Sequence, residues 1–247
     1  MTMDPAATAP AAAAAPAAAA AATAAAPVHA SNLSGTRFEA ASAVGDPPIS
    51  PGAVLDFFHL CESLKTTRRT GWIEQGIERC ESISDHMHRM TLMALVLPAV
   101  PGLDVGRCAL MAAVHDLAEA IVGDITPSQN VAPDVKHGLE RDAMAQIAAM
   151  LENGPQAQRV LALYNEYEAG KTREAQIVKE IDKYEFIVQT FEYEQREMRL
   201  LEEFFISTRG KFKTAVVQDW VAELYRRRDA WKAVHPELSE ASSSASS

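Results

Sequence analysis

The chain has 247 residues, a formal net charge of −10 and 48% hydrophobic residues, which is the composition of an ordinary globular protein with a sizeable core. The acidic excess argues against a general surface for nucleic acid or anionic membranes, so any phosphate group has to be captured by local cations. No apolar run approaches the roughly 18 residues of a membrane-spanning helix, and we expect no membrane segment.

The cysteine content predicts a reducing compartment. Cys61, Cys80 and Cys108 form an odd set without C-x-x-C spacing, which is typical of reduced core or surface thiols. We therefore expect the protein to be cytoplasmic.

Both ends of the chain have compositions that predict disorder. Residues 1–45 are dominated by alanine and proline and lack the larger apolar side chains that a packed element needs. A transit peptide, which would make the protein organellar, is the alternative because acidic residues are scarce there, although the stretch also lacks the several arginines of such peptides. The Ser-rich residues 237–247 predict a second tail, which leaves 46–236 as the folded domain.

Helical signals begin at Ser50. Ser50 and Pro51 supply an N-cap and a first helical residue, and an apolar stripe at 3-4 spacing continues to about Lys65. We expect a polar link over 66–82 to follow.

The next expected helix carries the first candidate ligand. Ser84 is its expected cap, and the apolar pattern continues to about Leu97. His86 lies on the apolar side of this helix, whereas His88 projects about 200° away and faces elsewhere.

The central stretch predicts a helix with polar side chains on one face. Asp104 is its expected N-cap and Gly123 its expected stop. At about 100° per residue, His115 and Glu119 lie about 40° apart, and Asp116 falls within about 100° of His115. A buried carboxylate must be paired, hydrogen-bonded or bound to a metal, so a divalent cation is the simplest partner for this face.

The rest of the chain predicts further helices and no strands. The expected helices cover 135–151 and 155–169, then a long one from a Thr172 cap to about Ile206, and a last one that begins near Thr214. No segment of useful length has the period-2 pattern of a strand, and no internal repeat is present. The expected fold class is therefore all-α.

Two imidazoles and two carboxylates make a candidate metal set. A lone histidine on an apolar helix face is more often a hydrogen-bonded core residue than a ligand, but here four ligand-type residues occur. They are His86, His115, Asp116 and Asp182. Together they form a mixed nitrogen and oxygen donor set that suits Mn, Fe, Co, Zn or Mg. Asp182 has apolar residues four positions away on either side, so its carboxylate is costly to bury without a partner.

Three motifs carry a resemblance to a known family. They are SDHMHRM at 84–90, HDLAE at 115–119 and GDITP at 123–127. With the H…HD…D pattern they resemble the HD-domain metal-dependent phosphohydrolase superfamily, in particular the eukaryotic HD domain-containing protein 2 branch, which is similar to the bacterial 5′-deoxynucleotidases. The resemblance covers roughly 53–203 and implies an HD-domain helical bundle. It also implies a metal, with a bound water as nucleophile, held by His86, His115, Asp116 and Asp182.

The resemblance implies roles for residues around that metal. It implies that Glu119 and Asp124 are acid/base groups, or that they bind a second cation together with the Ile125 carbonyl. It also places the family's phosphate-binding arginine on Arg69, and a guanidinium does bind phosphate oxygens bidentately. From the residues alone, a solvated loop cation is the alternative for Arg69.

One departure from the bacterial branch concerns the sugar pocket. In that branch a tryptophan directly follows the arginine, whereas here Thr70 follows Arg69 and the nearest tryptophan is Trp72. The preference for deoxyribose over ribose is therefore open.

The resemblance implies an enzyme that hydrolyses (deoxy)ribonucleoside 5′-monophosphates to nucleoside and inorganic phosphate. Mn, Co or Mg is the expected cofactor, with Zn or Fe as alternatives. An HD phosphodiesterase or a guanosine tetraphosphate hydrolase is the closest rival activity. A non-catalytic nucleotide or metal sensor is the rival from another class, although a binding module has no need of both the metal set and the additional carboxylates.

The resemblance also implies a homodimer. The segment 172–206 carries Phe191, Tyr193, Phe204 and Phe205, more apolar surface than one small core needs. Packing of these aromatic residues against the last helix of the same chain is the alternative. We expect no nucleic-acid or membrane partner.

Overall fold

The described part of the chain is helical. A computed structural model describes residues 45–238, so the predicted tails lie almost wholly outside it and stay predictions. The helices are α1 (Pro51–Thr66), α2 (Thr70–Glu74), α3 (Ile83–Leu95), α4 (Val105–Ala112), α5 (Glu119–Val122), η1 (Pro127–Gln129), α6 (Pro133–Met150), α7 (Pro155–Ala169), α8 (Arg173–Glu197), α9 (Glu202–Thr208) and α10 (Ala215–Ala233). Between residues 45 and 238 the only β feature is one isolated bridge, which confirms the all-α class. No helix in that range is both long and apolar enough to cross a membrane.

Most predicted helix ends are confirmed. The Ser50 side chain caps α1 by accepting a hydrogen bond from Ala53 N at 3.3 Å, and the Thr172 side chain caps α8 in the same way. Asp104 caps α4, and Gly123, in the left-handed region with φ of 76°, ends α5. These ends could be predicted because each depends on a few neighbouring residues.

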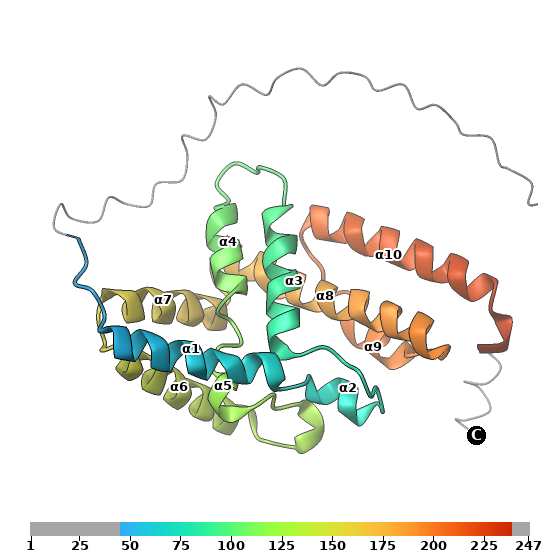
Figure 1. The fold of residues 1–247 in the computed structure, drawn as a ribbon. Coiled ribbons are helices and arrows are strands. Elements are labelled where there is room, and N and C mark those ends of the chain that lie inside the picture. Colours follow the sequence, from blue (N-terminus) through green and yellow to red (C-terminus); the bar gives the residue numbers. More distant parts are fainter. Residues whose placement is uncertain (1–44, 239–247) are drawn as a thin grey trace, which may run out of the picture. The chain divides into compact units, whose positions relative to one another are not determined.

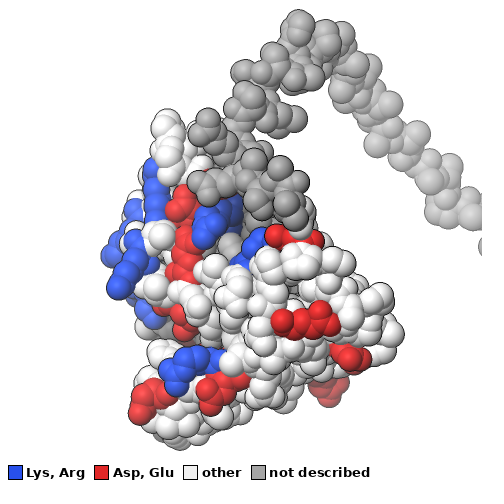
Figure 2. All heavy atoms as spheres, turned by 90° about the vertical axis from the view of Figure 1, so that its left-hand side faces the viewer, with Lys and Arg blue, Asp and Glu red and all other residues white. Residues whose placement is uncertain are grey.

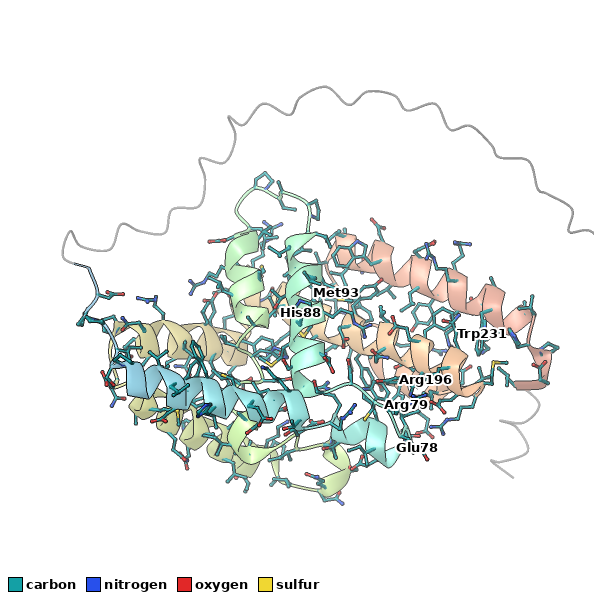
Figure 3. All side chains as sticks on the ribbon, viewed as in Figure 1. Glu78, Arg79, His88, Met93, Arg196 and Trp231 are labelled. Atoms are coloured by element: carbon teal, nitrogen blue, oxygen red, sulfur yellow. The ribbon has the colours of Figure 1, made fainter. Side chains whose placement is uncertain are left out.

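The predicted cap of α3 is wrong by two residues. Ser82 Oγ accepts a hydrogen bond from Asp85 N at 3.1 Å, and Asp85 Oδ2 accepts one from Ser82 N at 2.8 Å. This reciprocal pair satisfies two N–H groups at once, so the helix begins at Ile83 and Ser84 lies inside its first turn. His88 is exposed on α3, as predicted (Figure 3). His86 is buried.

The prediction of a plain polar link over 66–82 is also wrong. The segment contains α2, and Trp72 in that helix is 1% exposed. Its indole N–H donates to Glu81 Oε1 at 3.0 Å, and its ring stacks on Phe186 with centroids 5.0 Å apart. A large aromatic side chain with a satisfied N–H thus fixes this segment against α8.

The central helix is interrupted at the HDLAE motif, contrary to the prediction. Between α4 and α5 the backbone makes tighter i→i−3 hydrogen bonds, such as that from Glu119 N to Asp116 O at 3.0 Å. The Ala112 carbonyl, which would accept from Asp116 N in a continuous α-helix, accepts instead from His115 Nδ1 at 2.9 Å. His115 and Asp116 therefore lie in a turn, and the helical angles expected between them do not apply.

The long helix α8 ends earlier than predicted, at Glu197 instead of about Ile206. Met198 takes a left-handed conformation with φ of 51°, and α9 follows as a separate helix. The buried Glu194 carboxylate stabilises this corner because it accepts from Leu201 N and from the Arg228 guanidinium, both at 2.6 Å.

The aromatic residues that suggested a dimer face pack largely within the chain. Phe191, Tyr193 and Phe205 are buried, and the Phe191 ring lies 5.8 Å from the ring of Trp231 in α10. The alternative of packing against the last helix holds for Phe191 and Phe205, whereas Tyr193 packs against Trp72 of α2, and the homodimer stays a prediction.

The packing of α3, α4 and α8 brings the predicted metal ligands together. α3 and α4 lie side by side and both cross α8, while α9 and α10 pack on the second half of α8 (Figure 1). α7 also contacts α4 and α8, and α6 contacts α5 and α7. On the face drawn in Figure 2, basic and acidic side chains lie beside one another on one side, and much of the rest of that face is uncharged.

Candidate functional site

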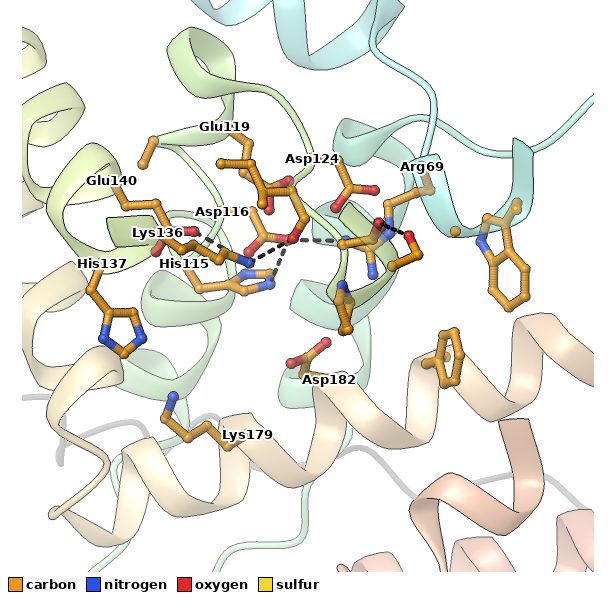
Figure 4. Close-up of a pocket in the computed structure, with 18 of the residues that line it drawn as sticks. Arg69, His115, Asp116, Glu119, Asp124, Lys136, His137, Glu140, Lys179 and Asp182 are labelled. Atoms are coloured by element: carbon orange, nitrogen blue, oxygen red, sulfur yellow. Dashed lines mark hydrogen bonds and ion pairs between the residues drawn. The ribbon is translucent and has the colours of Figure 1, made fainter. Parts of the chain in front are cut away.

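A cavity of about 660 Å³ adjoins the predicted ligands His115, Asp116 and Asp182. Segments far apart in the sequence line it: the α2 region, the HDLAE turn, the loop 123–128, and the helices α6, α7, α8 and α9. Figure 4 shows Arg69, Asp116 and Asp124 together on one side of this space, with Lys136, His137 and Lys179 further along it.

Two buried histidine nitrogens face the deepest part of the site. Nε2 of His86 and Nε2 of His115 are both buried, and neither has a hydrogen-bond partner among the described residues. The Nδ1 atom of His115 lies 2.9 Å from the Ala112 carbonyl, which can only accept, so Nδ1 carries the hydrogen and Nε2 carries the lone pair. An unpartnered buried lone pair is costly, which indicates that this position takes a ligand.

Two carboxylates face the same nitrogens. Asp182 Oδ1 lies 3.4 Å from His86 Nε2, and Asp116 Oδ2 lies 3.1 Å from His115 Nε2. Burial by itself would raise the pKa of Asp182, but the contact with His86 holds that pKa well below its ordinary value. Burial would likewise raise the pKa of Asp116, but His115 and Arg69 hold that pKa below its ordinary value. Both side chains are therefore anions.

This donor set fits a divalent metal ion. Donor atoms of His86, His115 and Asp182 lie within 4.8 Å of one another, and Asp116 is adjacent. Imidazole nitrogen with carboxylate oxygen is a common donor combination for divalent first-row metals. The structure thus brings together all four residues predicted as metal ligands.

The two further carboxylates also line the cavity. Glu119 is 5% exposed, and its Oε2 atom has no hydrogen-bond partner among the described residues. Burial, together with the charges of Asp116 and Asp124, raises the pKa of Glu119 to about 10. Asp124 Oδ2 accepts from Thr70 N at 2.6 Å, so it anchors its loop to the start of α2.

The Ile125 carbonyl is already occupied by a cation. Lys136 Nζ donates to it at 3.0 Å and lies 3.5 Å from Glu140. The ammonium group thus places a positive charge directly beside the carbonyl that was predicted to help bind a second cation.

The two adjacent arginines point in different directions, as predicted. Arg69 Nη1 lies 3.3 Å from Asp116 Oδ2, and its side chain is only 17% exposed. Burial disfavours its charge, but Asp116 and Asp124 more than offset this and raise the pKa of Arg69. Arg68 instead donates to the Cys80 carbonyl and is exposed.

Sequence reasoning missed two residues that contact the donor set. Glu185 Oε2 lies 2.5 Å from His86 Nδ1, and the Tyr167 hydroxyl donates to Asp182 Oδ2 at 2.9 Å. The spacing of Asp182 and Glu185, three positions apart on one helix, is a signal that could have indicated Glu185. No comparable signal indicates Tyr167, because α7 meets α8 only in the folded chain.

Comparison with known proteins places the chain in a family. The HD domain family model matches residues 61–224. The 5′-deoxynucleotidase HDDC2 of Danio rerio is 45% identical over 161 residues, which cover 64% of this chain and 80% of that protein. The protein of the same name from Xenopus laevis is 41% identical and covers 76% of this chain and 94% of its own length.

A solved structure agrees with the sequence matches. The crystal structure of the PH0347 protein from Pyrococcus horikoshii is similar with a TM-score of 0.59 and 30% identity, over 70% of this chain and 96% of that one. The family match, the relatives and the fold all lead to one conclusion, which is that the chain belongs to the HD domain family.

Proposed function

We propose that the protein is a 5′-deoxynucleotidase, which hydrolyses nucleoside 5′-monophosphates, deoxyribonucleotides above all, to nucleoside and inorganic phosphate. One observation carries this proposal: an arginine and a set of metal donors converge in one cavity. Arg69 Nη1 is 3.3 Å from Asp116, and Asp116 adjoins the unpartnered nitrogen of His115. Relatives named 5′-deoxynucleotidase support the substrate class.

The reaction divides into tasks that these residues can perform. The bond between phosphorus and O5′ breaks, a bond between phosphorus and a water oxygen forms, and O5′ takes up a proton. His86, His115, Asp116 and Asp182 would hold a divalent cation, which would supply the Lewis acidity that acidifies water and offsets phosphoryl charge. We assign Arg69 to the phosphate oxygens, because its guanidinium directly contacts Asp116 of the donor set.

Glu119 is our candidate for the proton. Its Oε2 atom is buried, lines the cavity and has no hydrogen-bond partner among the described residues. It can therefore hold a proton and release it to O5′. The alternative is a second cation bound by Glu119 and Asp124, and Lys136 at the Ile125 carbonyl argues against it. Asp124 then acts chiefly by holding its loop to Thr70.

The metal expected in this site is Mn²⁺, Co²⁺ or Mg²⁺. Two imidazoles and two carboxylates are an intermediate donor set, softer than the all-oxygen sites of Ca²⁺ and harder than the thiolate-rich sites of Zn²⁺. Zn²⁺ and Fe²⁺ are the alternatives.

A phosphate-release screen tests the activity. Deoxyribo- and ribonucleoside 5′-monophosphates, cyclic dinucleotides and guanosine tetraphosphate are incubated with the purified chain and each metal in turn. Release of inorganic phosphate from the monophosphates alone is expected. Cleavage of only the cyclic dinucleotides or the tetraphosphate would establish a rival activity, and binding without any turnover would establish a sensor.

We also propose that the protein is a homodimer, as the resemblance implies. Exposed apolar side chains on the first helix, Leu55 and Phe58, offer a surface for self-association. Light scattering at micromolar concentration should give twice the mass of 26.8 kDa, and a monomeric mass would rule the dimer out.

A further inference from the structure

A buried carboxylate lies directly behind His86, on the side away from the cavity. Glu185 in α8 is fully buried, and its Oε2 atom is 2.5 Å from His86 Nδ1. An ionised carboxylate can only accept, so Nδ1 carries a hydrogen, and in the neutral ring that binds a metal the lone pair is on Nε2, the nitrogen that faces Asp182.

Arg89 fixes this carboxylate in place. Its Nε atom donates to Glu185 Oε1 at 2.7 Å, and its other nitrogens contact Gln189 and Glu192. Arg89 follows His86 by one helical turn on α3, so both partners of Glu185 come from the same helix. One oxygen of Glu185 is thus committed to the arginine, and the other is left for the histidine.

Arg89 also lies beside a second group of residues that could hold a metal ion. Glu81, His86 and Glu185 also lie close enough to hold an ion. The guanidinium of Arg89 is 2.5 Å from Glu185 and 3.9 Å from Glu81. It supplies the positive charge there, so we assign no metal to that group.

We propose that Glu185, held by Arg89, is a positioning residue that fixes the tautomer and orientation of His86 for binding a divalent cation through Nε2. This inference rests on the proposed role of His86 as a metal ligand. Carboxylate partners of this kind orient metal-binding histidines and increase their basicity, and their loss costs about 10- to 100-fold in metal affinity.

The test measures Mn²⁺ affinity directly, by the electron paramagnetic resonance signal of free Mn²⁺, in the full-length chain. Glu185→Gln introduces an amide that can donate to Nδ1 and force the hydrogen onto Nε2. We expect its dissociation constant to rise about 10- to 100-fold. Glu192→Gln is the matched control, because Glu192 contacts the same arginine from an exposed position. It should change the constant less than about twofold.

A double-mutant cycle separates positioning from a general effect on folding. In a His86→Ala background the Glu185→Gln change should alter Mn²⁺ affinity less than about twofold, because the group that Glu185 positions is gone. Glu185→Asp keeps the anion and should bind Mn²⁺ with an affinity between those of the wild type and Glu185→Gln. If Glu185→Gln does not fold by circular dichroism, the same cycle is run with Glu185→Asp.

The outcomes distinguish this inference from the proposed function. Unchanged affinity in the Glu185 variants, or an equal loss with and without His86, overturns the positioning role. Absence of Mn²⁺ binding by the wild-type chain would instead overturn the metal centre itself.

Discussion

At the scale of single residues, Arg68 and Arg69 are neighbours in the chain but have different surroundings. Arg69 contacts Asp116 inside the cavity, whereas Arg68 binds the backbone carbonyl of Cys80 from an exposed position. Arg69→Ala removes the partly buried cation that we assign to the substrate phosphate, a loss of about 2 to 5 kcal/mol. We expect kcat/KM to fall about 30-fold to several thousand-fold.

Arg68→Ala is the matched control for Arg69→Ala in steady-state phosphate release. An exposed charge contributes about 0 to 1 kcal/mol, so its kcat/KM should change little. Equal losses in the two variants would indicate general electrostatic attraction, and a larger loss for Arg68→Ala would move the phosphate contact to that residue.

Glu119 should behave differently from the metal donors. Glu119→Ala removes the proposed proton donor and should lower kcat by a factor of about 10² to 10⁴ while the protein keeps its metal. His115→Ala and Asp116→Ala should lose metal and activity together. Elemental analysis of the purified variants distinguishes the two cases. Loss of metal in Glu119→Ala would place that residue in the coordination shell.

At the scale of elements, the start of α3 depends on the Ser82–Asp85 capping box. Ser82→Ala should lower the free energy of unfolding by about 1 kcal/mol, measured by urea denaturation. Ser84→Ala, two residues on, is the control and should stay within about 0.5 kcal/mol of the wild type. A larger loss of unfolding free energy in Ser84→Ala than in Ser82→Ala would show that Ser84 is the cap.

The capping box also has a pH dependence of known sign. The hydrogen bond from Ser82 N is the main cause that lowers the pKa of Asp85, and burial opposes it. Stabilisation by Asp85 is therefore complete above the ordinary aspartate pKa and is lost as the pH falls through the lowered value. Ser82→Ala keeps this backbone N–H, so the pH dependence should persist in that variant, whereas Asp85→Asn should remove it in the same urea denaturation experiment.

The corner between α8 and α9 should be sensitive to one buried ion pair. Arg228 donates two hydrogen bonds to Glu194, both at 2.6 Å, and both side chains are almost fully buried. Arg228→Met leaves an unpaired buried carboxylate, so it should cost about 3 to 5 kcal/mol of unfolding free energy. Arg226→Met, an exposed arginine of the same helix, should cost almost nothing in the same denaturation experiment.

At the scale of the whole molecule, metal binding should control both activity and stability. Exhaustive chelation should abolish phosphate release, and Mn²⁺ or Co²⁺ should restore it. A cation that binds the folded but not the unfolded chain stabilises the folded state. A metal concentration 100 times the dissociation constant should therefore add about 2.7 kcal/mol to the unfolding free energy. A thermal melt with and without metal measures this. Full turnover by protein shown to be metal-free would contradict the prediction.

The sequence by itself determined the all-α class, most helix ends and all four residues of the candidate metal set. Caps such as Ser50 and Thr172 depend on side chains within one turn, so local pattern sufficed to predict them. The motifs with His86, His115, Asp116 and Asp182 indicated four donors, which the fold brings together. A buried carboxylate needs a partner wherever it lies, and this requirement is visible from residue types.

Only the tertiary structure decided how those residues are held. The HDLAE segment leaves the α-helix because the His115 ring takes the Ala112 carbonyl, a competition between side chain and backbone that helix propensity does not include. Glu185 meets His86 across 99 residues, because α3 and α8 cross there. Such contacts depend on packing between distant segments, and hydrophobic periodicity specifies which face is buried but not which side chain it meets.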